Sequence, residues 1–194
     1  MVHDDATVSR RVRALETELE RRGIVDGGML DDILDRLLAH STPRQGARVI
    51  AHAWVDESFR RRLLDDGNAA IAELGLSMSH GPAPQRLRVV ENTERVHNVV
   101  VCTLCSCYPI SLLGPSPSWY KSESYRSRVV RWPREVLAEF GLELSVKVEI
   151  RVWDASAETR YLVIPGRPVG TENATEDGLS ALVTRAGMIG TAAV

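Results

Sequence analysis

The first third of the chain mixes apolar and charged positions at the spacing of amphipathic helices. Apolar residues three and four positions apart predict helical segments, because that spacing places them on one face of a helix. Gly23 ends the first segment, Pro43 lies in the first turn of the third, and Gly75 ends the fourth. The four segments are carried by Val12, Leu15 and Leu19; by Leu30, Ile33, Leu34, Leu37 and Leu38; by Val49, Ile50, Ala53 and Trp54; and by residues 68–74.

The second half has Val-rich, alternating runs typical of strands, with short helices between them. Residues 79–84 carry two prolines and a glycine, so we expect a helical N-terminal region over 1–78 and a second domain over 85–194. This order predicts an α+β protein, in which an extended helical N-terminal arm wraps a partner and a mixed α/β domain follows. Strands are predicted at 87–90, 96–101, 146–152 and 161–164, and helices at 134–140 and 177–184.

Composition and charge argue against two classes of partner. The chain has 24 Lys and Arg against 26 Asp and Glu, a net charge of −2, which gives no sign of nucleic-acid binding. No apolar run reaches the roughly 18 residues of a membrane span. The acidic start of the chain is not followed by the apolar segment of a signal peptide. We therefore expect a cytoplasmic protein that binds neither nucleic acid nor membrane.

The three cysteines are the most informative residues, because all of them lie between positions 102 and 107. A disulfide framework would spread an even number of cysteines along the chain. A single tight cluster instead indicates metal or redox chemistry. The segment from Val101 to Pro109 reads Val-Cys-Thr-Leu-Cys-Ser-Cys-Tyr-Pro.

Cys105 and Cys107 are separated only by Ser106, which is closer than the usual spacing of zinc ligands. If the peptide nitrogens of Ser106 and Cys107 also lose their protons and bind, the four donors close fused six- and five-membered chelate rings. Such donors can lie in one plane, as transition metals with square-planar or tetragonal preferences require. Cys102 can add an axial thiolate, which leaves the sixth position open. Neither amide position is proline, which has no N–H.

Two other interpretations of the cluster stay open on spacing alone. The three cysteines and His97 can form a four-ligand structural zinc site. Cys102 and Cys105 can form a redox Cys-x-x-Cys pair, although the βαβ context of such pairs is missing.

The cysteine segment resembles the metal-binding loop of nitrile hydratase α subunits, and the resemblance covers nearly the whole chain. Thr103 and Tyr108 are similar to the cobalt branch of that family, whereas the iron branch usually carries Ser and Thr there. The resemblance implies the nitrile hydratase α-subunit fold and a lyase that adds water to a nitrile to give an amide. Further matching segments are 47–49, 53–56, 91–93, 97–98, 119–122, 125–126, 128–131, 136–141, 149–154, 157–158, 160–161, 167–168, 182–184 and 188–191.

The resemblance also implies a metal centre and its catalytic groups. One low-spin Co(III) per chain would be bound by Cys102, Cys105, Cys107 and the amides of Ser106 and Cys107. Cys105 would be a sulfinate and Cys107 a sulfenate, a level of oxidation that exposed thiolates reach. Cys107, Cys105 and Ser106 would then form the catalytic centre, with the metal polarising nitrile or water. The attacking nucleophile, either water or the Cys107 sulfenate, stays undecided.

Other residues take supporting roles by the same resemblance. Asp154, Glu158 and Arg160 match a polar network near the subunit boundary, although a strand end and a solvated turn would look similar. Tyr108, Ile110 and Ser111 are the candidate walls of the substrate pocket. We expect the basic group of Arg126, Arg128, Arg131 and Arg134 to form an interface or a solvated face.

The family pattern implies partners and leaves alternatives. The chain would need a β-type subunit, present as one chain or split in two, whose arginines neutralise the sulfur oxygens. A cobalt-insertion activator protein and a small-molecule nitrile complete the set. A thiocyanate hydrolase subunit shares the same cobalt loop and is the nearest alternative, and a structural zinc-binding protein is the alternative of another class.

Two departures from the family pattern affect the expected substrate. After Pro109 the family usually continues with Trp-Pro, whereas this chain has Ile110 and Ser111. Residues 173–175 replace the usual Gly-Trp-Ser. Loss of a large rigid ring predicts a wider pocket and a bulky heteroaromatic or nucleoside-type nitrile.

Overall fold

The computed structural model describes residues 5–39, 41–78 and 85–194 and divides the chain into two compact units, Met1–His40 and Ser41–Val194. The break expected at residues 79–84 lies outside the described residues. The division falls earlier in the chain because α4 (Glu57–Asp65) and α5 (Gly67–Glu73) pack against the first strand and so belong to the second unit.

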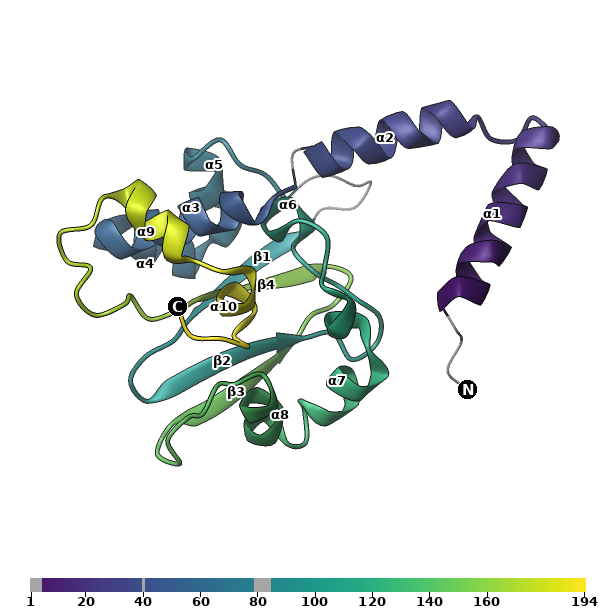
Figure 1. Cartoon of the computed structure of the whole chain (residues 1–194). Helices are drawn as coiled ribbons and strands as arrows, with labels where there is room; N and C mark the ends of the chain where they lie inside the picture. Colours follow the sequence, from purple (N-terminus) through teal and green to yellow (C-terminus); the bar gives the residue numbers. More distant parts are fainter. Residues whose placement is uncertain (1–4, 40, 79–84) are drawn as a thin grey trace. The chain divides into compact units, whose positions relative to one another are not determined.

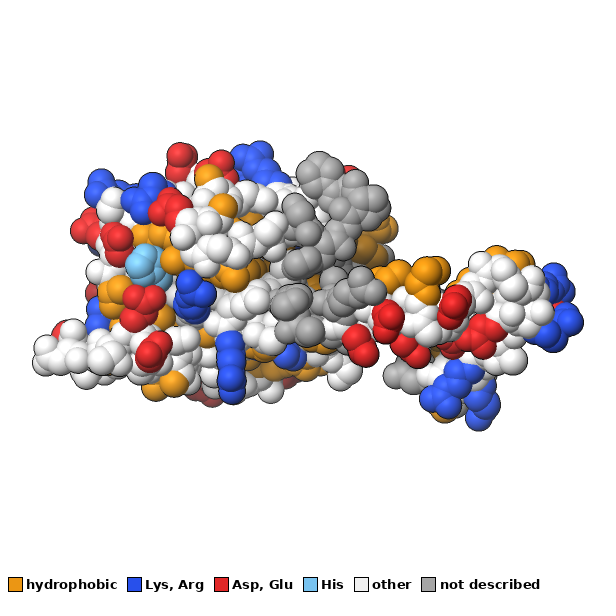
Figure 2. All heavy atoms as spheres, turned by 90° about the horizontal axis from the view of Figure 1, so that it is seen from above, with side chains coloured by type: hydrophobic (Ala, Val, Ile, Leu, Met, Phe, Trp, Pro, Cys, Tyr) orange, Lys and Arg blue, Asp and Glu red, His pale blue; other side chains and the backbone are white. Residues whose placement is uncertain are grey.

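The first unit consists of the two helices that the apolar spacing predicted, α1 (Asp5–Arg21) and α2 (Gly27–Ala39). Gly23 follows α1 in the left-handed region with φ +64°, as expected of a residue that ends a helix. The space-filling view shows hydrophobic side chains on the surface of this unit beside charged ones (Figure 2). On α1 the exposed apolar residues are Val8, Val12 and Leu15.

Three helices open the second unit. α3 (Pro43–Val55) begins with Pro43 at its first position, as predicted. α4 was not predicted, because it buries only Phe59 and Leu63 among charged residues. Its N-terminus is capped by Asp56, whose carboxylate accepts a hydrogen bond from the Phe59 backbone N–H at 2.9 Å.

In the described part of the chain, four strands form two parallel pairs. β1 (Arg86–Glu91) pairs with β4 (Thr159–Ile164), and β2 (Val96–Val101) pairs with β3 (Glu149–Asp154). The strand predicted from residue 146 begins only at Glu149, because residues 145–148 form a turn in which the backbone N–H of residue 148 donates to the carbonyl of residue 145 at 2.9 Å. The alternation of half-buried and exposed side chains along β3 agrees with the prediction.

Helices cover both sides of the strand pairs, which confirms the expected α+β class (Figure 1). α3, α4 and α9 (Glu176–Leu182) lie on the side of β1 and β4, and α7 (Glu123–Arg128) and α8 (Pro133–Glu139) lie beside β2 and β3. The last predicted helix ends at Leu182 rather than Thr184, because the Thr184 hydroxyl caps a further helix by accepting from the Gly187 N–H at 3.0 Å. The remaining elements are α6 (Ile110–Leu113), the 3₁₀ helix η1 (Ser118–Lys121), α7 (Glu123–Arg128), α8 (Pro133–Glu139), α9 (Glu176–Leu182) and α10 (Arg185–Ile189).

The core lies between these layers and is mainly aliphatic, with buried tyrosines on the side of α7. Among the described residues, no helix is long and apolar enough to cross a membrane. The largest fully buried side chains include Phe59, Ile50, Leu63, Ile71, Leu112, Leu113, Tyr120, Leu137, Leu162 and Ile164.

Candidate metal centre

The cysteine segment begins where β2 and β3 end side by side. Val101 lies opposite Asp154 in the parallel pair, and the Ala155 backbone N–H donates to the Val101 carbonyl at 2.7 Å. Since both strands run in the same direction, the residue that follows β2 emerges beside the carboxylate that ends β3. We call residues 102–107 the cysteine loop.

The three cysteine sulfurs converge in this loop. Cys105 Sγ lies 3.5 Å from Cys102 Sγ and 3.2 Å from Cys107 Sγ, and all three sulfurs lie within 4.8 Å of one another. The Cys105 backbone N–H donates to Cys102 Sγ at 3.3 Å. Cys102 is buried, Cys105 is exposed and Cys107 is intermediate. The sequence prediction that these residues form one ligand cluster is therefore consistent with the geometry.

The spacing of the sulfurs favours donors at right angles. With metal–sulfur bonds of about 2.3 Å, two sulfurs would be about 3.3 Å apart at right angles and about 3.8 Å apart in a tetrahedron. The 3.2 Å between Cys105 and Cys107 matches the right-angled value, and the 3.5 Å between Cys102 and Cys105 lies between the two. The Cys105–Cys107 pair therefore fits the right-angled donors of an octahedral or tetragonal metal, whereas the Cys102–Cys105 pair does not distinguish the two geometries.

His97 does not join the cysteines, contrary to the zinc alternative. The residue lies near the start of β2, and the cysteine loop follows the end of that strand. Its Nδ1 is 3.2 Å from Asn92 Nδ2, and its Nε2 is 2.7 Å from the Gly190 carbonyl oxygen, so both ring nitrogens are already engaged. Among the described residues, the cluster of potential metal ligands contains the three cysteines alone. A four-ligand zinc site with His97 is therefore excluded.

The two more exposed cysteines, Cys105 and Cys107, differ in acidity. Hydrogen bonds from the Cys107 and Cys102 thiols and from the Ser106 N–H lower the pKa of Cys105 to about 7. Burial raises the pKa of Cys107 to about 12, an effect that the positive charge of Arg160 opposes. Cys105 is therefore the first of the pair to become a thiolate, the form that binds metals and is oxidised.

Asp154, a member of the predicted polar network, holds the start of the cysteine loop. Its carboxylate accepts from the Thr103 N–H at 2.9 Å and from the Thr103 hydroxyl at 2.5 Å. Arg160 is buried and donates to the carbonyls of Ser156 and Ala157. Glu158, the third residue of the predicted polar network, is exposed, and its carboxylate accepts a hydrogen bond from the Ser156 hydroxyl at 2.9 Å, away from the loop.

Two residues from the α7 side hold the other half of the loop. Arg126 Nη1 lies 3.2 Å from the Cys105 carbonyl oxygen and 3.4 Å from the Thr103 carbonyl oxygen. The Tyr120 hydroxyl donates to the Cys107 carbonyl at 2.9 Å. Arg126 was expected at an interface or on a solvated face. Tyr120 was not expected at the loop, because no local pattern relates residues so far apart in the chain.

The three candidate pocket residues occupy different environments. Tyr108 and Ser111 are buried, and the Tyr108 hydroxyl has no hydrogen-bond partner among the described residues. The Tyr108 ring meets the edge of the Tyr120 ring at a centroid distance of 5.1 Å. Ile110, the first residue of α6, is 40% exposed. Of the three, Ile110 alone presents its side chain to the surface.

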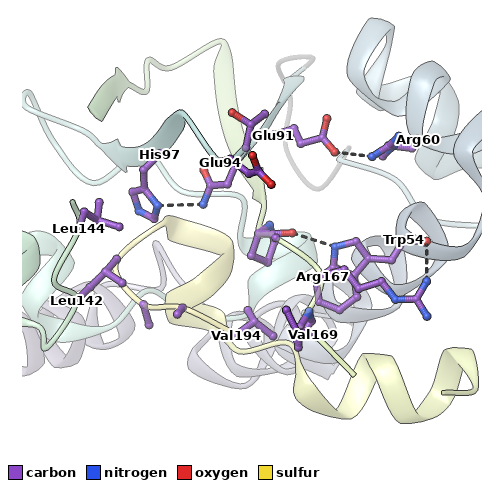
Figure 3. Close-up of a pocket in the computed structure, with 17 residues that line it drawn as sticks. Trp54, Arg60, Glu91, Glu94, His97, Leu142, Leu144, Arg167, Val169 and Val194 are labelled. Atoms are coloured by element: carbon purple, nitrogen blue, oxygen red, sulfur yellow. Dashed lines mark hydrogen bonds and ion pairs between the residues drawn. The ribbon is translucent and has the colours of Figure 1, made fainter. Parts of the chain in front are cut away.

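A cavity of about 690 Å³ lies at the other end of β2 from the cysteine loop (Figure 3). Its charged lining is largely engaged, since Arg60 pairs with Glu91 at 2.9 Å and Arg167 donates to the Trp54 carbonyl at 3.2 Å. No cysteine lines it. The candidate chemistry therefore belongs to the cysteine loop and not to this cavity.

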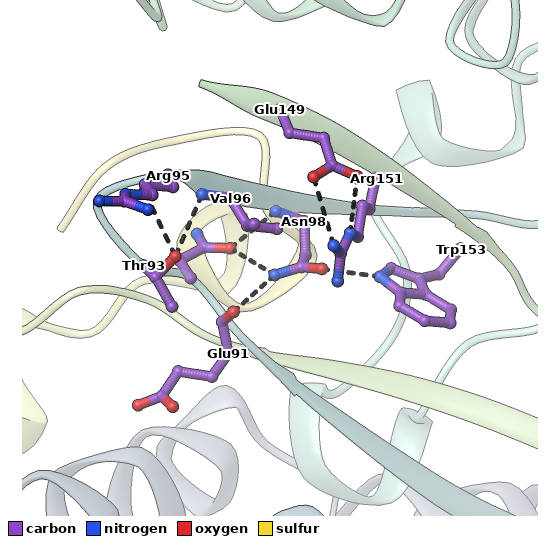
Figure 4. A network of polar contacts seen from close by, with 9 residues as sticks. Glu91, Thr93, Arg95, Val96, Asn98, Glu149, Arg151 and Trp153 are labelled. Atoms are coloured by element: carbon purple, nitrogen blue, oxygen red, sulfur yellow. Dashed lines mark hydrogen bonds and ion pairs between the residues drawn. The ribbon is translucent and has the colours of Figure 1, made fainter. Parts of the chain in front are cut away.

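A buried polar network fixes β2 against its neighbours (Figure 4). The Asn98 backbone N–H donates to Asn92 Oδ1 at 2.7 Å, and its side-chain Nδ2 donates to the Glu91 carbonyl at 2.8 Å. The Trp153 indole N–H donates to Asn98 Oδ1 at 2.8 Å. These bonds join β1, β2 and β3, so they restrain β2, the strand that ends at the cysteine loop, against its neighbours.

Comparison with known proteins identifies the family. The sequence profile described as "Nitrile hydratase, alpha chain" matches residues 6–192. The chain belongs to this family. The resemblance of the cysteine segment to nitrile hydratase α subunits is thereby confirmed.

Three relatives illustrate the proteins that this chain is similar to. It is 48% identical to the low-molecular weight cobalt-containing nitrile hydratase subunit alpha of Rhodococcus rhodochrous over 183 residues, which cover 94% of this chain and 87% of that one. It is 47% identical over 158 residues to the thiocyanate hydrolase subunit gamma of Thiobacillus thioparus, which covers 77% of this chain and 65% of that subunit. A mutant of the Fe-type nitrile hydratase from Comamonas testosteroni Ni1 superposes with a TM-score of 0.89 at 41% identity, covering 98% and 92%. The nitrile hydratase α-subunit fold is therefore confirmed.

Proposed function

We propose that this chain is the α subunit of a cobalt nitrile hydratase, a lyase that hydrates a nitrile to the corresponding amide. One low-spin Co(III) would be held by Cys102, Cys105 and Cys107 and by the amide nitrogens of Ser106 and Cys107. The observation that carries the proposal is the 3.2 Å separation of the Cys105 and Cys107 sulfurs across a single residue. Identities of 48% and 47% to cobalt-containing α subunits support cobalt.

The environments of Cys105 and Cys107 support the proposed oxidation states. Cys105 is exposed and has its pKa lowered to about 7 by the hydrogen bonds it accepts from Cys107 and Cys102. Cys107 is less exposed, and burial raises its pKa. Thiolate character and exposure govern oxidation, so these environments favour the sulfinate at Cys105 and the sulfenate at Cys107, with the oxygen atoms and the electron acceptor supplied by an external oxidant such as dioxygen.

When bound, the metal would supply Lewis-acid polarisation of a nitrile or of water. The residues of this chain provide the frame for that chemistry. The two hydrogen bonds from Thr103 to Asp154 fix the start of the loop, and the Tyr120 hydroxyl fixes the carbonyl at its end. A loop held at both ends in this way would keep the donor atoms in place for the metal.

A β-type partner, as one chain or two, would complete the site. Leu104, within the cysteine loop, is 89% exposed, and Val130, which lines the same surface cavity as Leu104, is 49% exposed. Apolar side chains this exposed around a reactive loop favour burial by another protein. A cobalt-insertion activator protein would act on the loop before that surface is covered.

The substrate would be a small-molecule nitrile, and we propose a bulky heteroaromatic or nucleoside-type one. The support is the exposed Ile110 at the start of α6, directly after the cysteine segment, where the family usually has Trp. A smaller side chain there leaves room that an indole would fill.

Thiocyanate hydrolysis is the second candidate, favoured by the 47% identity to a thiocyanate hydrolase gamma subunit. A structural zinc role is disfavoured by the 3.2 Å sulfur spacing and by the absence of a fourth potential ligand among the described residues.

The test is to express the full chain with a β-type subunit and cobalt, and to measure metal content, intact mass and turnover. We expect one cobalt per chain, the mass of one sulfinate and one sulfenate, and hydration of a nitrile in preference to thiocyanate. The Cys107→Ala variant should lose turnover, as should Cys105→Ala. Zinc with unmodified cysteines, or a fully active Cys107→Ala enzyme, would overturn the proposal. Robust turnover by the isolated cobalt-loaded chain would rule out the partner requirement.

A further inference from the structure

Arg126 makes an unusual pair of contacts with the cysteine loop. Its Nη1 faces two carbonyl oxygens, that of Cys105 at 3.2 Å and that of Thr103 at 3.4 Å. Its Nε is buried and has no hydrogen-bond partner among the described residues. Within the described part of the chain Arg126 forms no ion pair with a carboxylate, and its hydrogen bonds go to the two loop carbonyls.

The Cys105 carbonyl belongs to the same peptide unit as the Ser106 nitrogen. Resonance couples the two atoms, because the C–N bond has partial double-bond character. If the Ser106 nitrogen binds the metal, its N–H bond breaks, the proton leaves to solvent and a nitrogen–metal bond forms. The negative charge of that peptide is then shared between its nitrogen and the Cys105 oxygen, which is the atom that faces Arg126.

We propose that Arg126 is a positioning residue that stabilises the Cys105–Ser106 peptide as an anionic metal ligand. The inference rests on the proposed function, since it requires the Ser106 nitrogen to be a ligand. A cation at the oxygen offsets the charge of the bound peptide without occupying the coordination sphere. Among the described residues, no side chain donates to the Ser106 carbonyl, so the second amide ligand, Cys107 nitrogen, lacks this support.

The neighbouring contacts separate this role from simple packing. Tyr120 also holds the loop, through the Cys107 carbonyl, but its hydroxyl is neutral and that peptide unit is not a proposed ligand. Arg128 lies on the same helix and pairs with Glu139 instead of the loop. Arg128→Gln therefore removes the same charge from α7 without removing a loop contact and serves as the matched control.

The experiment compares Arg126→Gln, Arg126→Lys and Arg128→Gln with the wild type, each as the full chain co-expressed with its β-type partner and cobalt. Three quantities are measured: cobalt per chain, the rate of cobalt loss to a chelator, and the sulfur-to-cobalt charge-transfer absorption. We expect Arg126→Gln to lose cobalt roughly 10–100-fold faster, with a shifted absorption band. Arg126→Lys, which keeps the charge, should have a cobalt-loss rate and an absorption band between those of Arg126→Gln and the wild type. Arg128→Gln should match the wild type in both quantities.

Each outcome distinguishes the inference from the function on which it rests. A wild-type chain without cobalt overturns the proposed function. Wild-type cobalt content together with an unchanged loss rate and absorption band in Arg126→Gln overturns the role of Arg126 alone. If Arg126→Gln does not fold, Arg126→Lys decides: a cobalt-loss rate less than about tenfold above that of the wild type, with an absorption band close to the wild-type one, supports a charge role, and a loss at least about tenfold faster with a shifted band overturns it.

Discussion

Asp154 and Thr103 are joined by two hydrogen bonds, from the Thr103 N–H at 2.9 Å and from its hydroxyl at 2.5 Å, although 51 positions separate them in the chain. Asp154 is the last residue of β3, and Thr103 is the second residue of the cysteine loop. The strand end thus restrains the loop at the residue that follows the first cysteine.

Asp154→Ala should loosen the cysteine loop. Hydrogen bonds to a charged group contribute about 1.5–3 kcal/mol where they are shielded from water, and this exposed site lies at the low end of that range. We expect a modest loss of unfolding free energy and a roughly 10–100-fold faster release of cobalt. Glu158→Gln is the matched control, because its carboxylate contacts Ser156 and not the loop. Equal cobalt release by both variants would contradict this role.

Gly190→Ala should destabilise the second unit strongly. A Cβ at this position would lie 1.9 Å from the Asn98 carbonyl oxygen, and the residue has φ +87°. The left-handed conformation alone costs about 1–2 kcal/mol for a non-glycine residue, and displacement of the β2 backbone adds to it. Gly75→Ala is the control, since it has φ +73° but nothing within 4 Å of its Cβ. Chemical denaturation of both variants would measure the difference, and equal losses would contradict the clash.

Stability should fall in mild acid because of His97. Burial lowers the pKa of this imidazole, while a hydrogen bond to the Gly190 carbonyl acts in the opposite direction. The neutral ring is therefore favoured in the folded state. Its contribution is fully present above the ordinary histidine value of about 6.5 and is lost as pH falls through the lowered folded value.

The measurement is the unfolding free energy between about pH 8 and about pH 5. His97→Gln should remove part of the fall below about pH 6.5, whereas His52→Gln, at a residue that pairs with Glu176 away from this network, should retain it. A His97→Gln protein with the full wild-type pH dependence would show that another group is responsible.

Ile110→Trp should narrow the substrate range. Ile110 is 40% exposed at the start of α6, so an indole there can project toward a ligand beside the loop. Pocket walls discriminate by about 1–3 kcal/mol per methylene-sized change. We expect the ratio of kcat/KM for a bulky nitrile to that for a small nitrile to fall by at least about tenfold. Leu64→Trp on α4 is a control at an exposed leucine far along the chain, and an unchanged ratio in Ile110→Trp would exclude this residue as the selector.

The sequence predicted the elements whose burial follows a local period. α3, β2 and β4 were found because their apolar residues repeat at helical or strand spacing. The short helices α6, α7 and α10 were missed, because four to six residues do not establish a period and tertiary contacts define them.

The candidate site divides in the same way. The three cysteines could be grouped as ligands because their spacing is local. Arg126 could not, because it reaches the Cys105 carbonyl from 21 positions away and an arginine in a basic run has no pattern that distinguishes a loop contact from a solvated side chain. Backbone carbonyls as partners leave no trace in the sequence, since every residue has one.

The pairing of Val101 with Asp154 also sets a limit on how the gene for this chain can change. Side chains alternate between the faces of a strand, so a shift of β3 by one residue would turn the carboxylate away from Thr103. One residue inserted in the turn before Glu149 leaves the number of residues between the start of β3 and Asp154 unchanged, so the carboxylate still faces Thr103. One residue inserted or deleted between Glu149 and Asp154 moves the carboxylate to the other face of the strand and removes its hydrogen bonds to Thr103. Tolerance to insertions should therefore change abruptly at the first residue of β3.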